Sequence, residues 1–147
     1  MRQQIVTDDQ RERILAFWDR CIIWAHSQVP IPAGLLSALS GLAAYVTAIH
    51  EREHRLLLAV APHVGVDYRV YEFLNELLRL AEQNEAAIVD VVDAMVKAHA
   101  PEYDYEDGLQ RLLRTLAAKG RKNEVLRILD RLPAMHHLYN ELTQARV

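Results

Sequence analysis

The sequence predicts an all-α protein of about eight helices, arranged as antiparallel helix hairpins that stack into a short α-solenoid of the HEAT or TPR kind. Apolar residues recur at spacings of three and four in segment after segment, and the strict alternation of a half-buried strand is absent. Most of the five prolines and five glycines fall where a helical pattern stops. A chain of 147 residues is therefore predicted to form one helical-repeat domain over residues 1–147.

The first predicted helix begins after Thr7, which forms a capping box with Gln10. Its predicted core face consists of Ile14, Phe17, Trp18, Cys21, Ile22 and Ala25. The prolines of segment 30–32 end this helix, because proline lacks an amide donor. A second helix is predicted over residues 33–49 and a third over residues 50–61.

In the second half of the chain, Asp67 is predicted to cap a fourth helix, and Asn84 a fifth helix over residues 85–99. Pro101 is predicted to end the fifth helix, and Gly120 to follow the last turn of the sixth. The remaining leucine stripes, up to residue 142, predict the seventh and eighth helices. From Asp67 onward the helix pairs repeat with a period of about 36 residues.

Core positions follow from the same stripes. Leu77 and Leu113 are predicted to be fully buried, and Cys21 to be a small core residue rather than a reactive thiol. A single cysteine excludes an internal disulfide framework and fits a reducing cytosol, so a cytoplasmic location is expected. No apolar run reaches about 18 residues, and the N-terminus lacks a signal-peptide pattern, so no membrane association is expected.

The net charge of −3 is unevenly distributed. Residues 1–66 are neutral, residues 67–106 carry a net charge of −7, and residues 107–147 carry +4. The split indicates either electrostatic recognition or solvated helix faces that differ in composition. If recognition is the reason, the basic end of one molecule is predicted to meet the acidic middle of another in a weak homodimer. Arg127→Glu, Arg131→Glu and raised salt are expected to weaken such a dimer.

Residues 50–54 read His-Glu-Arg-Glu-His, the H-E-x-x-H signature of zinc proteases. In a metal-dependent hydrolase, His50 and His54 would be zinc ligands and Glu51 would polarise the metal-bound water. The candidates for a third ligand are His63, Glu72 and Glu76.

Three features speak against a metal centre at this segment. No strand is predicted that would bind an extended substrate. The segment is polar on every side, and Pro62 precedes His63 without the spacing of a known third ligand. We therefore expect a solvated turn between the second and third helices, with no metal and no cofactor.

A basic run in the C-terminal third offers a second candidate site. Its members proposed to bind a partner are Arg121, Lys122, Arg127 and Arg131. These side chains suit phosphates, but they lack interleaved aromatic residues, and the sequence pI of about 6.1 is far from that of a dedicated nucleic-acid binder. A nucleic-acid-binding adaptor is therefore an alternative function rather than the leading one.

The last half of the chain resembles the helical-repeat tails of large bacterial ATPases and sirtuin-like proteins of anti-phage defence systems. The resemblance is carried by "LLRLAEQN" (77–84), by the segment from Leu112-Leu113 to Gly120, by "LRILDRL" (126–132) and by "LYNEL" (138–142). Near the N-terminus, "DDQRERILAFWDRC" is similar to the Arg- and Trp-containing helix that opens such tails. Glu85 departs from the pattern, which has proline after the asparagine.

This resemblance implies the C-terminal module of something larger, without catalytic residues. The leading prediction is thus a non-catalytic protein–protein interaction module, a sensor or scaffold tail of a bacterial antiviral defence system. Its partner is expected to be a protein, including a second copy of the chain. A small zinc hydrolase and a nucleic-acid adaptor remain the alternatives.

Overall fold

The computed structural model describes residues 6–64, 69–98 and 106–144, and every regular element within them is helical, so the all-α class is confirmed. The α-helices are α1 (Asp8–His26), α2 (Ala33–Leu39), α3 (Glu51–Val60), α4 (Arg69–Leu80), α5 (Glu85–Ala98), α6 (Glu106–Leu116), α7 (Lys122–Leu129) and α8 (His136–Gln144). Short 3₁₀ segments lie at η1 (Ser40–Tyr45), η2 (Ala61–His63) and η5 (Pro133–Met135), and a π-helical turn, η4 (Ala117–Arg121), joins α6 to α7. Within the described ranges, no helix is long and apolar enough to cross a bilayer.

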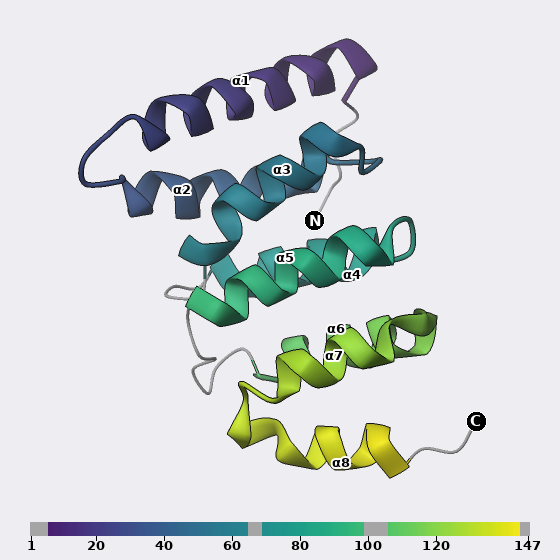
Figure 1. Ribbon diagram of the computed structural model, residues 1–147. Coiled ribbons are helices and arrows are strands. Elements are labelled where there is room, and N and C mark those ends of the chain that lie inside the picture. Colours follow the sequence, from purple (N-terminus) through teal and green to yellow (C-terminus); the bar gives the residue numbers. More distant parts are fainter. Residues whose placement is uncertain (1–5, 65–68, 99–105, 145–147) are drawn as a thin grey trace.

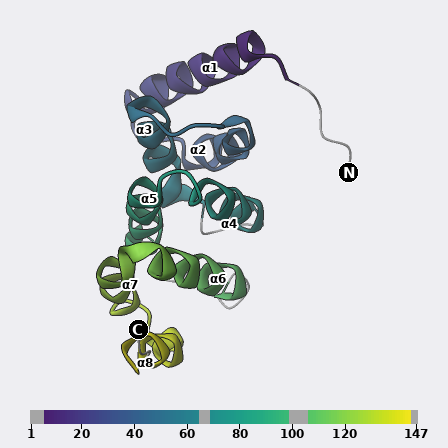
Figure 2. The same cartoon turned by 90° about the vertical axis from the view of Figure 1, so that its right-hand side faces the viewer.

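The helices follow one another down the molecule, from α1 at one end to α8 at the other (Figure 1). Turned by 90°, α3, α5 and α7 form one column beneath α1, and α2, α4 and α6 form a second column beside it (Figure 2). The helices of the second column begin at residues 33, 69 and 106, which are 36 and 37 residues apart. One hydrophobic cluster, from Leu15 to Leu138, runs through the described part of the chain.

Three helix ends lie where the local sequence predicts them. The Thr7 amide donates to Gln10 Oε1 (2.9 Å) and the Gln10 amide to Thr7 Oγ1 (3.1 Å), which confirms the capping box. Asn84 Oδ1 accepts from the Ala87 amide (3.1 Å), as expected of the N-cap of α5. Gly120 has a φ of 95°, the left-handed conformation predicted for it. The predicted roles of Asp67 and Pro101 lie outside the described residues.

The core contains Leu77 and Leu113, both with no exposed surface, as predicted. Cys21 is partly buried and packs against this core. The predicted face of α1 is wrong at Phe17, which is 51% exposed. The buried face of α1 is formed by Leu15, Trp18, Ile22 and Ala25. Because α1 carries apolar residues on two adjacent stripes, its periodicity alone does not select the one that packs inward.

The continuous helix predicted over residues 33–49 is also wrong. The α-helix ends at Leu39, 3₁₀ turns follow to Tyr45, and Val46 is extended (φ −79°, ψ 124°). The Arg79 guanidinium of α4 donates to the carbonyl oxygens of Val46 (3.0 Å) and Ala43 (3.2 Å). A distant side chain therefore satisfies carbonyl groups that a longer helix would have satisfied internally, and tertiary contact overrides the local pattern.

Candidate interaction surfaces

The histidine-containing segment starts α3 and forms part of the joint between α1 and α3. His50 is the residue before the helix and has extended backbone (φ −100°, ψ −173°). Its amide donates to Glu53 Oε1 (3.1 Å), a contact that satisfies one unpaired donor at the helix start. Because His50 lies outside the helix, it does not share a helical face with His54 in the way the zinc-protease motif requires.

The burial of Glu53 shows that the prediction of a solvated turn is wrong. This carboxylate is buried, and its Oε2 accepts from Arg52 Nε (3.2 Å) and Nη2 (3.1 Å). Arg52 also holds Glu12 of α1 through two hydrogen bonds, of 2.6 and 2.9 Å. The hydrogen bonds from Arg52 lower the pKa of Glu12, and those to Glu12 raise the pKa of Arg52. The segment is thus an inter-helix clamp rather than a solvated turn.

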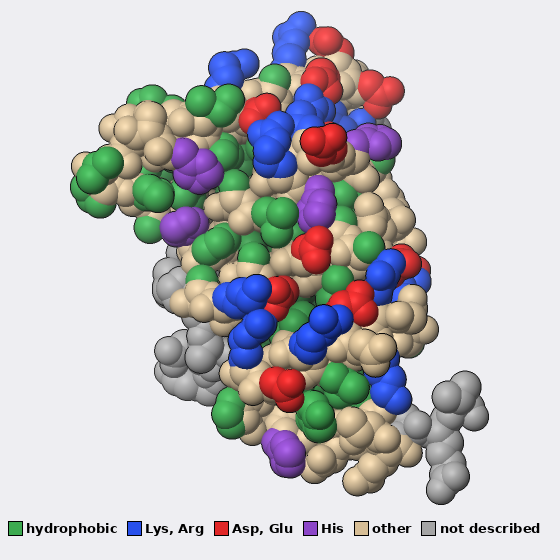
Figure 3. Space-filling view, viewed as in Figure 1, with side chains coloured by type: hydrophobic (Ala, Val, Ile, Leu, Met, Phe, Trp, Pro, Cys, Tyr) green, Lys and Arg blue, Asp and Glu red, His purple; other side chains and the backbone are tan. Residues whose placement is uncertain are grey.

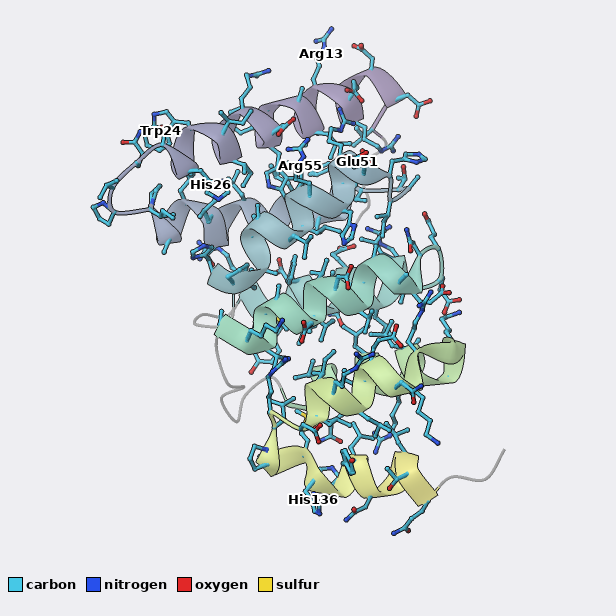
Figure 4. All side chains as sticks on the ribbon, in the orientation of Figure 1. Arg13, Trp24, His26, Glu51, Arg55 and His136 are labelled. Atoms are coloured by element: carbon cyan, nitrogen blue, oxygen red, sulfur yellow. The ribbon has the colours of Figure 1, made fainter. Side chains whose placement is uncertain are left out.

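His54 faces α5 instead of a cluster of metal ligands. Its Nε2 lies 3.4 Å from Asp90 Oδ2, without the geometry of a hydrogen bond. Glu51 is exposed at the start of α3 and lies near Arg55 on the same helix (Figure 4). Among the described residues, no group of three or more His, Cys, Asp or Glu side chains is placed to hold a metal ion.

The three candidates for a third zinc ligand lie on other elements. His63 is at the end of η2. Glu72 and Glu76 lie on α4, where they line a hollow of about 220 Å³ against α2 and η1. Glu76 is paired there with Arg79, at 2.7 Å. The structure therefore does not bring the residues of the predicted zinc site together.

Four ion pairs between one level of the stack and the next have similar sequence separations. These four are Glu12–Arg52, Asp19–Arg55, Glu82–Lys119 and Asp93–Arg131, with separations of 40, 36, 37 and 38 residues. The pair Arg114–Glu141, between α6 and α8, has a shorter separation of 27 residues. Figure 4 shows Arg55 between the ribbons of α1 and α3. Opposite charges are thus offset by roughly one helix pair, and each joins one level of the stack to the next. These pairs could be anticipated from the sequence, because the opposite charges align at the predicted repeat period of about 36 residues.

In two of these pairs, an acidic residue of segment 67–106 binds a basic residue of segment 107–147. Lys119 Nζ lies 2.9 Å from Glu82, and Arg131 contacts Asp93. Burial raises the pKa of Asp93, but hydrogen bonds from Lys97 and Arg131 outweigh it and leave the pKa below its ordinary value. Some of the charges that were predicted to bind an external partner are therefore paired within the molecule.

The four predicted binding residues of the basic run are in different situations. Arg121 lies 3.2 Å from Glu124 and 3.8 Å from Glu85, and Arg131 is held by Asp93. Lys122 is partly exposed in the first turn of α7. Arg127 is exposed and has no ion pair within the described part of the chain.

A groove between α5 and α7 collects much of this charge. It has a volume of about 280 Å³ and is lined by Val89, Asp90, Asp93, Lys97, Glu124, Arg127, Ile128 and Arg131. Figure 3 shows blue and red side chains gathered over this part of the molecule. Since three acidic and three basic side chains line the groove, it has no excess of either sign to attract a nucleic acid.

The most unusual surface lies on α1 and the loop after it. Among the residues that the structure describes, the exposed large apolar side chains are Phe17 (51%), Ile23 (66%), Trp24 (54%), Val29 (98%), Ile31 (47%) and Tyr71 (46%). All of them except Tyr71 fall within residues 17–31, and we call these five the α1 apolar surface. Figure 3 shows green side chains at this end of the molecule, and in Figure 4 Trp24 lies at the end of α1. Clustered exposed apolar side chains mark an interaction surface more often than isolated ones do.

Comparison with known proteins adds no assignment. The sequence matches no protein-family model, and neither the curated proteins nor the solved structures contain a significant match to it. The class of the chain is therefore defined by its all-helical fold and by its own surfaces.

Proposed function

We propose that the chain is a cytoplasmic, non-catalytic protein–protein interaction module built as a short α-solenoid, and that the α1 apolar surface is its principal binding site. The single observation that carries the proposal is the concentration of exposed apolar side chains within residues 17–31. Trp is among the side chains that contribute most to binding when a partner covers them, and Phe and Arg are enriched at interfaces. Arg13 and Arg20, both exposed, lie on the same helix.

The ion pairs between helices support a different role for the charged residues. They join α1 to α3 and α5 to α7, so these residues stabilise the stack of helices rather than bind a ligand. A binding module of this kind presents a rigid surface on stacked helices, and a stack that leaves one end helix uncovered exposes apolar area there. The end helix in question is α1, which packs against the rest of the molecule from one side only (Figure 1).

The biological setting is proposed from the resemblance of residues 77–142 to the tails of bacterial defence proteins. In that setting, the chain would act as a sensor or scaffold, and the α1 apolar surface would contact the partner. The support is the leucine spacing of the C-terminal half together with its helical pairing, α4 with α5 and α6 with α7.

The test places a photo-crosslinking amino acid at position 24 and, as a control, at the exposed position 111 on α6. In the organism of origin, we expect covalent protein adducts from position 24 and few from position 111. The partner identified by mass spectrometry is then purified, and its Kd is measured with the wild type, Trp24→Ala and the control Arg111→Ala. We expect Trp24→Ala to weaken binding about tenfold or more. Equal adducts at both positions, or an unchanged Kd in Trp24→Ala, would overturn the proposal.

A further inference from the structure

A second apolar stripe runs along α1 beside its buried face. Its members are Ile14, Phe17, Cys21 and Trp24, at successive spacings of three, four and three residues. Ile14 and Cys21 are partly buried, whereas Phe17 and Trp24 are exposed, so within the described part of the chain no helix covers these two aromatic side chains. Apolar residues at this spacing form the seam along which one α-helix packs against another. The second stripe therefore has the pattern of a helix-binding surface.

The direction in which this stripe faces follows from the ion pairs of α1. Asp19 Oδ1 lies 2.6 Å from Arg55 of α3, so Asp19 is on the flank of α1 that faces α3. At about 100° per residue, Phe17 and Trp24 are rotated by roughly 140° to 160° from Asp19 around the helix axis. Because α1 also packs on α2 and η1, the stripe lies away from α3, on the side of the second column (Figure 2).

The second column has no helix beside α1 among residues 6–64, 69–98 and 106–144. Below this level, α3 lies beside α2, α5 beside α4, and α7 beside α6 (Figure 2). α1, α3, α5 and α7 all run in the same direction (Figure 1), so α1 has the place and the direction of a helix of the first column, that of α3, α5 and α7. Short connections make each helix of the second column antiparallel to its neighbour. The place beside α1 therefore fits one further helix, antiparallel to α1.

Charge at the edge of the stripe indicates the chemistry of that helix. Arg13 and Arg20 are both exposed and lie along the outer edge of the stripe. Arg13 is paired with Asp9 on the same helix, at 2.9 Å, whereas Arg20 has no ion pair within the described residues. A carboxylate on the partner would therefore pair with Arg20, since the guanidinium group binds carboxylates through two parallel hydrogen bonds.

We infer that the partner contributes an amphipathic α-helix that packs antiparallel to α1, covers Phe17 and Trp24 with its apolar side and places an acidic side chain against Arg20. The helix continues the second column by one level, so it uses the same kind of helix-to-helix packing that holds the stack together. This inference rests on the proposed function, since it names the chemistry of the partner at the same surface.

The spacing of crosslinks tests for the helix. A photo-crosslinking phenylalanine derivative is placed at position 17 or at position 24, two turns and about 10 Å apart along α1. On an antiparallel partner helix, the two adducts should fall about seven residues apart, with the adduct from position 24 nearer the N-terminus of the partner. On an extended segment they would fall only about three residues apart. Mass spectrometry of the purified adducts locates both sites.

Charge reversal tests the acidic side chain. Arg20→Glu should raise the Kd of the partner identified by crosslinking about tenfold, because a like charge replaces an attractive one. Changing the partner's acidic residue nearest the two adducts to lysine should restore the Kd in the Arg20→Glu protein. Arg111→Glu is the matched control, because it changes an exposed arginine on α6 and should leave the Kd unchanged. Circular dichroism checks that each variant keeps its helix content.

Several outcomes would overturn the inference and leave the proposed function in place. They are adducts about three residues apart, adducts in the parallel order, adducts between two copies of the chain, and a Kd that Arg20→Glu leaves unchanged. Equal adducts at positions 24 and 111 would refute the inference together with the proposed function. Binding to anionic phospholipid vesicles through Trp24, without any protein adduct, would also refute both.

Discussion

Leu77→Ala tests the packing of the central helices quantitatively. Leu77 lies on α4 with no exposed surface, in the layer where α4 packs against α6 and η1. The substitution removes roughly three carbon atoms, which corresponds to about 2.4 kcal/mol of lost transfer free energy. A residual cavity of several tens of Å³ adds about 1 to 2 kcal/mol. The free energy of unfolding should therefore fall by about 2 to 5 kcal/mol, and Leu113→Ala on α6 should behave alike because Leu113 is equally buried.

The assay is urea unfolding followed by circular dichroism, with the midpoint and slope fitted for each variant. Asn75→Ala is the matched control on α4, since Asn75 is exposed and its truncation should change the free energy by less than about 0.5 kcal/mol. Leu78→Ala, at a partly buried position, should fall between the two. A loss below about 1 kcal/mol for both Leu77→Ala and Leu113→Ala would mean that these stripes do not form the core.

Three further predictions concern a turn, the response to acid and metal content. Gly120→Ala should destabilise the protein by about 1 kcal/mol in thermal unfolding, because φ is 95°, whereas Gly41→Ala should be close to neutral, because an added Cβ there meets no atom within 4 Å. The pKa values of Glu12 and Asp93 are lowered in the folded state, so their stabilisation is complete above the ordinary carboxyl pKa and is lost as the pH falls through the folded values. Glu12→Gln should therefore flatten the acid limb of a plot of stability against pH, and an unchanged limb would refute the assignment. Elemental analysis should find no stoichiometric zinc, and about one zinc per chain that is lost in His54→Ala would contradict the role given to that segment.

Several helix ends and the central core were predictable because their causes are local. Thr7, Asn84 and Gly120 act on the backbone within four residues of themselves, so the sequence contains both partners of each interaction. The stripe on α4 has one apolar face and one polar face, and its burial therefore follows from periodicity.

The errors arose where the deciding contact is distant in sequence. The end of the helical segment near Tyr45 depends on Arg79 of α4, which binds the carbonyl oxygens of Ala43 and Val46. Phe17 was assigned to the core because α1 is apolar on two stripes, and only the packing of its neighbours decides between them.

The candidate surfaces were predictable only in part. The basic run is evident in the sequence, but the pairing of Arg131 with Asp93 depends on the packing of α5 against α7. The histidine segment was correctly placed at the start of a helix, while the burial of Glu53 required the arginine clamp with Glu12. The α1 apolar surface was not predicted: Phe17 was assigned to the core, and Ile23, Trp24, Val29 and Ile31 were given no role.

The two tryptophans make one measurement decisive for the α1 apolar surface. Trp24 is exposed on this surface, and Trp18, on the inward face of the same helix, is fully buried. Protein labelled with 5-fluorotryptophan therefore carries a reporter and an internal control. We predict that the fluorine NMR resonance of Trp24 shifts as the partner crosslinked at position 24 is added, while that of Trp18 stays in place. A Trp24 resonance that remains unchanged in this titration would contradict the role of α1 as the binding surface.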